Sequence, residues 1–446
     1  MALSERFEDF QVAGLLAHRA TRDPSSPFLL TGSGPLTYAE IDSQAEAMAA
    51  SIAHLGVGQG DRIALVLPSW PEFAVSVFAA AKLGAVIVPL NPRLTLPELR
   101  YMLRHSGAAL AISGENVYGI DYLHLFEDLL VELPELQYLI TVGEEDLWYD
   151  DRIFQWEDLI SAGKGRDFTA PSVDRNDAFA ILYTSGTTGK PKGVELTHGN
   201  LIHVAAETVE AVGLQAEDRV VGVTALFHVF GLGPGLIGTL LGGASLILQD
   251  EFGAKETLEL VERHGATVHF GVPTLFATEL REAERREVDL SSVRICLAAG
   301  APTRDDLARE VEKRFGAPLL IAYSLTELGS TVALTRPTDP EGKKRHTVGR
   351  PVGGTEVKVI DESGAVLPVE SVGELAVRGP GVTRGYHRQP RETQSAMDGE
   401  GYLKTGDLGM LDEEGYIHLV GRRTDVVIRG GFNVHPREVE DRLMAH

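Results

Sequence analysis

Short apolar runs that alternate with stretches of helical spacing constrain the fold of this chain more than any other feature. The runs cover residues 62–67, 85–88, 109–113, 266–270 and 319–322. One helix between such segments is marked at its start by the capping-box pair Thr37 and Glu40, and it is expected to end before Gly56. Continuous apolar strands between amphipathic helices are typical of largely parallel sheets covered on both faces. The sequence therefore predicts an α/β fold.

The pattern changes after about residue 349. Short segments at 356–360, 373–378 and 416–420 are separated by turns rich in Asp, Glu, Ser and Gly. This texture predicts a smaller β-rich subdomain at the C-terminal end.

Length and charge exclude several classes of protein. With 446 residues and 43% hydrophobic content, the chain can bury a sizeable core. It carries 64 acidic and 41 basic residues, a net charge of -23, which repels nucleic acid and anionic membranes. An anionic ligand therefore needs a site that is locally basic or rich in backbone amides.

Cysteine content and the N-terminus favour the cytoplasm. The single cysteine, Cys296, excludes an intramolecular disulfide and lies in an apolar run, so it is expected to be a buried thiol. The first 30 residues contain no apolar segment behind a basic start, so no secretory signal is visible.

Residues 220–249 contain no Asp, Glu, Lys or Arg, and their length alone would nominate a membrane span. His228, Pro234 and seven glycines interrupt the stretch, with turn-like clusters at 231–235 and 242–243. We therefore predict a buried strand, a loop and a buried helix, and no integral membrane segment.

The strongest chemical signal is the segment YTSGTTGKPKG at residues 183–193, directly after an apolar run. Its glycines allow close backbone approach, its hydroxyls and amides can donate to phosphate oxygens, and its lysines supply positive charge. It is not a Walker A loop, because the four-residue spacing is absent and Pro191 stands where Ser or Thr is required. Any strand can end in a polar, glycine-rich turn, but this composition favours phosphate binding.

This segment resembles the phosphate loop of the adenylate-forming superfamily, which includes acyl-CoA synthetases, peptide-synthetase adenylation domains and luciferases. The resemblance extends from about residue 30 to the last residue and is closest to an acyl-CoA synthetase. It implies two largely parallel sheets plus the β-rich subdomain, and it implies catalytic roles for Thr184 and Lys192. The loop residues implied to bind ATP are Thr184, Ser185, Gly186, Thr187, Thr188, Gly189 and Lys190.

Three further segments resemble nucleotide-binding motifs of the superfamily. Residues 322–327 (AYSLTE) match the segment whose aromatic residue lies near adenine and whose Thr326 and Glu327 face the phosphates and Mg²⁺, although a Thr-Glu pair is usually an ordinary helix start. Residues 298–302 match the turn that borders adenine and the acyl group, and residues 402–407 with Arg422 match the ribose site. The resemblance thus assigns ATP to Gly300, Ala301, Pro302, Ala322, Tyr323, Ser324, Leu325, Thr326, Asp407 and Arg422. It also implies that Thr326 and Glu327 are catalytic, with Glu327 as the metal ligand.

Residues 227–231 (FHVFG) resemble the segment that lines the carboxylate pocket of the family. A histidine in an apolar stretch is more often a core residue, whereas the resemblance gives His228 a catalytic and pocket role. The residues implied to bind the acid are His228, Val229, Phe230, Gly300 and Tyr323. Their apolar neighbours favour a fatty or aryl acid.

Residues 425–439 resemble the linker into the mobile C-terminal lid of the family. Gly430 and Gly431 stand where CoA-using relatives pass the pantetheine arm, and Thr424 stands at the pivot position, where Asp or Lys is common. We expect an AMP-binding domain over 1–421, with α/β subdomains over about 1–345 and the β-rich subdomain over about 346–421. Residues 422–446 are expected to be the hinge and the start of a truncated lid, without the lysine that completes the family's active site. Adenylation by this chain is therefore expected to be impaired.

The resemblance implies ATP-dependent activation of a carboxylic acid to an acyl adenylate and then to an acyl-CoA thioester. The implied enzyme uses ATP, Mg²⁺ and CoA, and its partners are small molecules. The sequence does not determine the oligomeric state. Two alternatives remain at this point: an adenylation domain that loads a carrier protein, and a non-catalytic adenylate-binding module.

Overall fold

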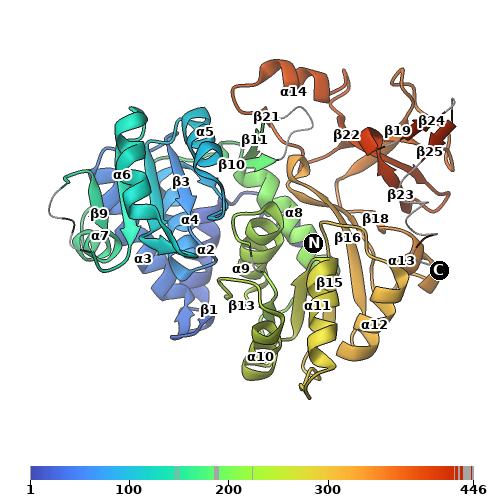
Figure 1. The fold of residues 1–446 in the computed structure, drawn as a ribbon, viewed down its shortest axis with the longest axis horizontal. Coiled ribbons are helices and arrows are strands. Elements are labelled where there is room, and N and C mark those ends of the chain that lie inside the picture. The colour runs from blue at the N-terminus through green and yellow to red at the C-terminus, as the bar shows by residue number, and fades with distance from the viewer. Residues whose placement is uncertain are drawn as a thin grey trace.

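The computed structural model describes residues 2–145, 147, 150–184, 190–223, 225–425, 427–429, 432–434 and 443. Two large sheets, each with a core of parallel strands, form most of the molecule (Figure 1). Most of the first sheet lies in the blue to green part of the ribbon and most of the second in the green to orange part, although β1 and β2 of the second sheet are blue and β21 of the first is orange-red. A smaller antiparallel sheet, drawn in red, follows at the C-terminal end. The prediction of two largely parallel sheets with flanking helices and a β-rich subdomain is confirmed.

The first sheet has the strand order β21-β11-β10-β4-β3-β5-β8-β9. The strands from β10 to β9 are parallel, whereas β11 and β21 are antiparallel additions at one edge. The strands are β3 (Arg62–Val66), β4 (Val86–Pro89), β5 (Leu110–Gly114), β8 (Tyr138–Val142), β9 (Ile153–Gln155), β10 (Ala178–Thr184), β11 (Lys192–Thr197) and β21 (Gly385–Tyr386). The helices of this part are α3 (Tyr38–His54), α4 (Pro71–Leu83), α5 (Leu96–Ser106), α6 (Tyr122–Glu132) and α7 (Trp156–Gly163).

The second sheet has the order β18-β17-β16-β15-β14-β12-β13-β1-β2 and is parallel from β16 to β1. Its strands are β1 (Pro27–Thr31), β2 (Gly34–Thr37), β12 (Arg219–Val221), β13 (Ser245–Ile247), β14 (Val268–Gly271), β15 (Ile295–Ala298), β16 (Leu319–Leu325), β17 (Ser330–Leu334) and β18 (Arg350–Pro351). The associated helices are α2 (Val12–Arg22), α8 (His198–Val212), α9 (Gly238–Gly242), α10 (Ala254–His264), α11 (Pro273–Ala283), α12 (Asp305–Phe315) and α13 (Glu341–His346).

The third sheet is antiparallel throughout, in the order β19-β20-β22-β23. Its strands are β19 (Glu356–Ile360), β20 (Gly373–Arg378), β22 (Leu403–Leu411) and β23 (Ile417–Arg422), and α14 (Pro390–Ala396) precedes β22. The short elements are α1 (Leu3–Arg6), the hairpins β6 (Asn116–Val117) with β7 (Ile120–Asp121) and β24 (Val427–Arg429) with β25 (Phe432–Val434), and a 3₁₀ turn at Arg423–Asp425.

Two local predictions are confirmed. Thr37 caps α3: its hydroxyl accepts from the Glu40 amide at 3.2 Å, while the Glu40 carboxylate accepts from the Thr37 amide at 2.8 Å. Cys296 is completely buried on β15, and burial raises the pKa of its thiol.

The prediction of a turn at residues 231–235 is wrong. Gly231–Ile237 form a π-helical segment that runs into α9, with Pro234 inside it. A proline breaks the α-helical hydrogen-bond pattern, whereas a wider π turn can accommodate it. The glycines also let α8 approach, because a Cβ on Gly238 would lie 2.7 Å from Cγ1 of Val209. The same stretch contains a second strand, β13, which the sequence pattern did not predict. Among the described residues, no helix is long and apolar enough to cross a membrane.

Candidate active site

Three of the predicted site segments meet at one edge of the second sheet. His228 follows β12, Gly300 follows β15 and Thr326 follows β16, and these strands belong to one parallel array. The carboxyl ends of parallel strands share an edge, which is where open α/β sheets bind their ligands. Gly300 has a φ of +82°, a left-handed conformation that suits glycine. Ala301 and Pro302, which follow it, are exposed.

The third sheet brings the predicted ribose residues to this edge. Asp407 on β22 pairs across the sheet with Arg422 on β23, and the Arg422 Nε lies 3.2 Å from its Oδ1. The other carboxylate oxygen accepts a hydrogen bond from the Tyr323 hydroxyl at 2.6 Å. Ala322, Ser324 and Leu325 are the neighbours of Tyr323 on β16. The structure therefore joins residues that the sequence placed in two separate motifs.

Burial controls the ionisation of Asp407. Its side chain is 9% exposed, and burial raises the pKa of Asp407 above the ordinary aspartate value. The Tyr323 hydrogen bond and the Arg422 charge act in the opposite direction and favour the carboxylate. Burial wins, so the Asp407 pKa stays above its usual range.

The strands on either side of the predicted phosphate loop form an antiparallel pair. Thr184, the last residue of β10, lies opposite Lys192, the first residue of β11. Ser185, Gly186, Thr187, Thr188 and Gly189 lie outside the described residues. Lys190 is exposed, and its Nζ lies 5.6 Å from the ring centroid of Tyr101. The pairing places one hydroxyl and two lysines around the base of the loop.

Helix α5 anchors both strands of this hairpin, which the sequence analysis missed. The Tyr101 hydroxyl donates to the Pro191 carbonyl at 3.2 Å, and Nδ1 of His105 lies 2.8 Å from the Tyr183 hydroxyl. Tyr183 also donates to the Met102 carbonyl at 3.1 Å. One phenolic hydrogen cannot serve two acceptors, so His105 is the donor to Tyr183. The four-residue spacing of Tyr101 and His105 on one helix face was the available signal.

A 3₁₀ turn, Thr326–Leu328, carries the predicted metal ligand Glu327. Gly329 ends the turn with a φ of +68°, and Ser330 follows with a φ of +115°, which is unusual for a residue with a side chain. The π-helical segment packs beside this turn, since a Cβ on Gly233 would lie 3.5 Å from the Gly329 carbonyl oxygen. The helix that follows His228 is thus in contact with the turn that presents Glu327.

Tyr386 on β21 contacts two of the predicted catalytic residues. Its hydroxyl donates to Oε1 of Glu327 at 3.1 Å, and Nζ of Lys192 lies 4.8 Å from its ring centroid. Burial, and next the Glu327 charge, raise the pKa of Tyr386, so the phenol keeps its proton at neutral pH. The sequence analysis did not identify Tyr386.

The predicted acid-binding segment precedes the π-helical segment. His228 has exposed surface, yet the surrounding protein removes enough water to lower the pKa of its imidazole. Val229 is buried, and the ring of Phe230 lies 5.6 Å from that of Phe270. His228 is therefore a neutral imidazole at neutral pH, with apolar residues beside it.

The described residues contain no group of three or more His, Cys, Asp or Glu side chains that could hold a metal ion. Glu327 offers one carboxylate, and only its Oε1 accepts a hydrogen bond from Tyr386. Mg²⁺ in nucleotide sites is usually held by one or two carboxylates together with phosphates and water. The donor set at Glu327 fits a metal that arrives with a nucleotide. Gly430 and Gly431, the predicted CoA contacts, lie outside the described residues.

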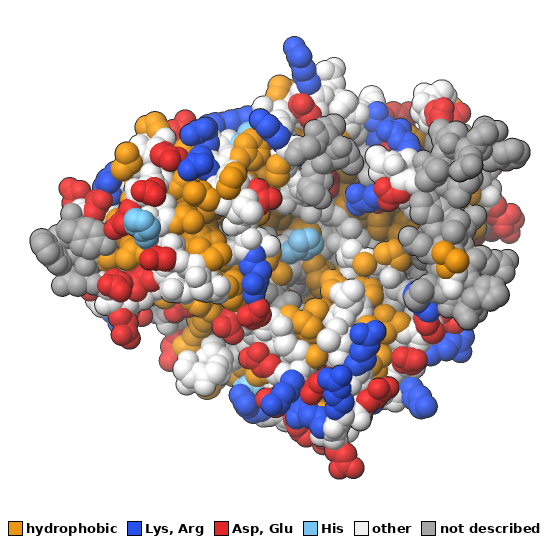
Figure 2. Space-filling view, in the orientation of Figure 1, with side chains coloured by type: hydrophobic (Ala, Val, Ile, Leu, Met, Phe, Trp, Pro, Cys, Tyr) orange, Lys and Arg blue, Asp and Glu red, His pale blue; other side chains and the backbone are white. Residues whose placement is uncertain are grey.

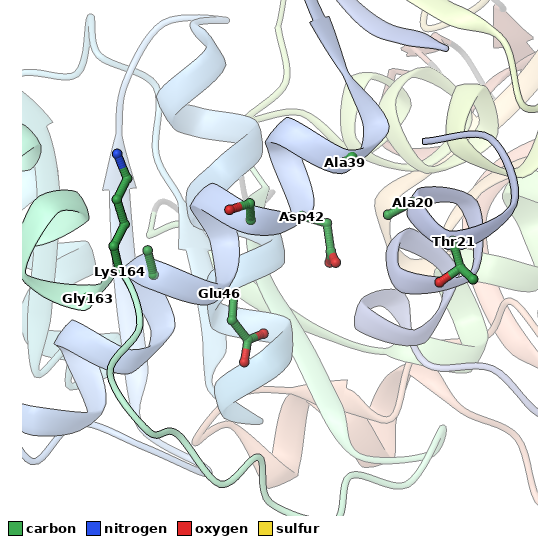
Figure 3. A pocket seen from close by; sticks show the side chains of 9 residues that line it. Ala20, Thr21, Ala39, Asp42, Glu46, Gly163 and Lys164 are labelled. Atoms are coloured by element: carbon green, nitrogen blue, oxygen red, sulfur yellow. The ribbon is translucent and has the colours of Figure 1, made fainter. Parts of the chain in front are cut away.

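One cavity lies away from all of these residues. It has a volume of about 370 Å³ and lies between α2, α3 and α7 (Figure 3). Asp42 and Glu46 line it from α3, with Lys164 across from them. Lys82 pairs with both carboxylates, at 2.9 Å and 2.8 Å, so these acidic groups already share a cation of the protein itself.

One face of the molecule carries both signs of charge. On the face shown in Figure 2, acidic and basic side chains are interspersed around the rim, and hydrophobic side chains lie toward the middle. The net charge of -23 is therefore not concentrated on this face as one acidic patch.

Comparison with known proteins identifies the family. The model of the AMP-binding enzyme family matches residues 16–387. A medium-chain fatty-acid–CoA ligase of Escherichia coli (strain K12) is 35% identical, with 92% of this chain and 72% of the relative covered. A feruloyl-CoA synthase of an Amycolatopsis species is 33% identical, with 96% and 82% covered.

Solved structures agree. An anthranilate CoA ligase in complex with anthranoyl-AMP has a TM-score of 0.90 at 27% identity, covering 100% of this chain and 84% of that one. The O-succinylbenzoate coenzyme A synthetase of Bacillus subtilis, solved with ATP and magnesium ion, has a TM-score of 0.82 at 29% identity, covering 97% and 84%. This chain belongs to the AMP-binding enzyme family, within the adenylate-forming superfamily. It is an AMP-forming acid–thiol ligase, which activates a carboxylic acid through an acyl adenylate to a CoA thioester.

Proposed function

We propose that the acid is an apolar fatty or aryl carboxylic acid and that ATP is bound together with Mg²⁺. The observation that carries the choice of acid is the apolar environment next to His228, where Val229 is buried and Phe230 packs near Phe270. Specificity pockets for small molecules are mostly apolar with a few polar groups that orient the ligand. A fatty or aryl tail against these residues, with the carboxylate toward His228, fits that description.

For the nucleotide, we propose that Asp407 accepts from the ribose hydroxyls and that Arg422 supports it. Tyr323 and the segment from Gly300 to Pro302 border the adenine. Thr184, Lys190 and Lys192 contact the phosphates, because they supply a hydroxyl and two positive charges at the base of the predicted loop.

For the metal, we propose that Glu327 is the protein ligand and that Thr326 lies beside the phosphates. Bound Mg²⁺ would neutralise phosphate charge as pyrophosphate leaves. The contribution of the protein is to hold Glu327 and Lys192 in fixed positions around the nucleotide, so that little reorganisation is needed during the reaction.

In the reaction, a carboxylate oxygen of the acid bonds to the α-phosphorus while the bond to the pyrophosphate oxygen breaks. The CoA thiol, after losing its proton, then bonds to the acyl carbon, and AMP leaves with the electron pair of the acyl–oxygen bond. Gly430 and Gly431 remain the proposed neighbours of the pantetheine arm. We also propose that the AMP-binding domain ends at residue 421, one residue before the end of β23 at Arg422.

A panel of carboxylic acids tests the proposal. Each acid is incubated with the protein, Mg²⁺-ATP and free CoA, and acyl-CoA is detected by mass spectrometry. The comparison is one of relative rates: we expect medium-chain fatty or aryl acids to give more thioester than short, polar acids. Thioester formation from polar acids alone would contradict the assignment of the pocket, and acylation of a carrier protein without any acyl-CoA would contradict CoA as acceptor.

A further inference from the structure

We propose that Tyr386 is a positioning residue, which holds Glu327 and Lys192 close together but unpaired, ready for a metal-bound nucleotide. This inference rests on the proposed roles of Glu327 and Lys192. It concerns a residue that no sequence motif above includes.

The Tyr386 side chain contacts both charged groups, but in different ways. The Tyr386 hydroxyl donates to Oε1 of Glu327 at 3.1 Å, whereas the Lys192 ammonium lies 4.8 Å from the centroid of the ring. The carboxylate thus receives a neutral donor, and the ammonium receives the electron-rich face of an aromatic ring. Neither contact cancels a charge.

These contacts also keep Lys192 and Glu327 from forming an ion pair with each other. A lysine and a glutamate that reach the same tyrosine are close enough to attract one another. Among the ion pairs of the described part of the chain, none joins Lys192 to Glu327, and each instead contacts Tyr386. A direct ion pair would offer the nucleotide a neutralised site. Because each residue contacts Tyr386 instead, the negative charge remains for the metal and the positive charge for a phosphate.

Tyr386 is itself held in place by pairing with β11. It pairs with Val194 on β11, and the amide of the next residue, His387, donates to the Gly193 carbonyl at 2.7 Å. Successive side chains of a strand point to opposite faces, so His387 lies on the other face, where its Nδ1 is 2.5 Å from Oε1 of Glu195. The strand is therefore fixed to β11, which begins at Lys192.

The same segment also fixes the main chain of Glu327. The Thr383 amide donates to the Glu327 carbonyl at 2.8 Å, and the Thr383 hydroxyl donates to the Glu195 carbonyl at 2.6 Å. Residues 383–387 therefore connect the lysine-bearing edge of the first sheet to the glutamate-bearing turn of the second sheet. A residue with only a packing role would not need its hydroxyl directed at this carboxylate.

The test compares nucleotide affinity with and without the metal. Isothermal titration calorimetry measures the Kd of α,β-methylene-ATP, which cannot be cleaved at the reacting bond, in Mg²⁺ and in EDTA. The readout is the factor by which Mg²⁺ tightens binding. We expect Tyr386→Phe to reduce this factor about tenfold or more, because a hydrogen bond to a charged group is lost, with little change in EDTA. We expect Tyr386→Leu to weaken binding in EDTA as well, because Lys192 also loses the ring.

The control is Tyr416→Phe. The Tyr416 hydroxyl donates to Asp339 at 2.9 Å and its ring lies 4.8 Å from Nζ of Lys343, so it makes the same two kinds of contact outside the proposed site. Its Mg²⁺ factor should equal that of the parent. A loss confined to the Mg²⁺ titration cannot come from misfolding, because binding in EDTA reports the folded fraction.

Glu327→Gln separates failure of the inference from failure of the proposed function. We expect this variant to lose most of the Mg²⁺ factor. If it does so and Tyr386→Phe keeps the full parental factor, the positioning role of Tyr386 is overturned and the metal role of Glu327 stands. If Glu327→Gln keeps the full factor, the metal role itself is wrong, and the inference falls with it.

Discussion

The Tyr323 hydroxyl donates to Oδ2 of Asp407 at 2.6 Å and so joins the second sheet to the third. Arg422 lies at the other carboxylate oxygen, at 3.2 Å. The two residues are 84 positions apart in the sequence, and their hydrogen bond is buried. The proposed ribose site is therefore built from two sheets, and its acceptor is positioned by a residue expected near the adenine.

Asp407→Asn should weaken ATP binding without unfolding the protein. Hydrogen bonds to a charged acceptor contribute about 1.5–3 kcal/mol, so the Kd for ATP is expected to rise about ten- to a hundredfold. The pKa of folded Asp407 is raised above its unfolded value, so this group's contribution to stability falls as pH rises through the folded pKa. Removing the charge should therefore not lower the Tm at pH 7. Calorimetry and thermal unfolding measure the two effects, and an unchanged Kd would refute the ribose role.

Tyr323→Phe should shift the pH dependence of ATP binding. The Asp407 carboxylate must be ionised to accept two ribose hydroxyls, so affinity is expected to fall as pH drops through the Asp407 pKa. The Tyr323 hydrogen bond lowers that pKa, so its removal should move the midpoint to higher pH. Kd values measured across pH for parent and variant provide the check. A midpoint that moves to lower pH would contradict the linkage.

Local patterns predicted much of the fold, because each depends on neighbouring residues. The Thr37 capping box and the apolar run at 62–67 needed only their own sequence, and both are confirmed as α3 and β3. The turn predicted at 231–235 failed because glycine spacing cannot distinguish a loop from a helix packed closely on α8. That distinction depends on Val209, which lies elsewhere in the chain.

The site residues also divide into those that a local motif predicts and those that depend on distant contacts. Tyr323, Asp407 and Arg422 were predicted through motif resemblance, and the structure brings them together. Tyr386 could not be predicted from spacing, since its contact with Glu327 spans 59 residues and depends on how β21 joins β11. Residues that act through a second side chain carry no chemical signature of their own.

His228→Ala should affect the acid more than the nucleotide. His228 precedes the π-helical segment, and its imidazole has a lowered pKa, so it acts as a neutral hydrogen-bonding group at neutral pH. Loss of one such bond should weaken acid affinity about three- to tenfold, with ATP affinity nearly unchanged. Titration with a fatty acid in the presence of α,β-methylene-ATP measures the first, and substitution of the exposed His124 on α6, His124→Ala, is the control. A loss on the ATP side alone would show that His228 is not in the acid pocket.

Gly238→Ala should destabilise the fold through the contact between α8 and α9. The added Cβ would lie 2.7 Å from Cγ1 of Val209, and overpacking of this kind costs about 1–3 kcal/mol. Urea unfolding measures the change. Gly342→Ala, where a Cβ meets nothing within 4 Å, is the control, and Val209→Ala combined with Gly238→Ala should recover part of the loss. Equal stability of the two glycine variants would contradict the close packing.

This chain is expected to bind an acyl adenylate, with the acyl group in an apolar pocket and the ribose on Asp407. Calorimetry with a fatty-acyl sulfamoyl adenosine, a stable mimic of that intermediate, tests it most directly. We expect a Kd at least about a hundredfold below that of AMP. The mimic gains binding free energy from both its nucleotide part and its acyl part, whereas AMP has only the first. We also expect most of this gain to be lost when the acyl chain is replaced by acetyl. An affinity no better than that of AMP, or one independent of the acyl group, would contradict the account.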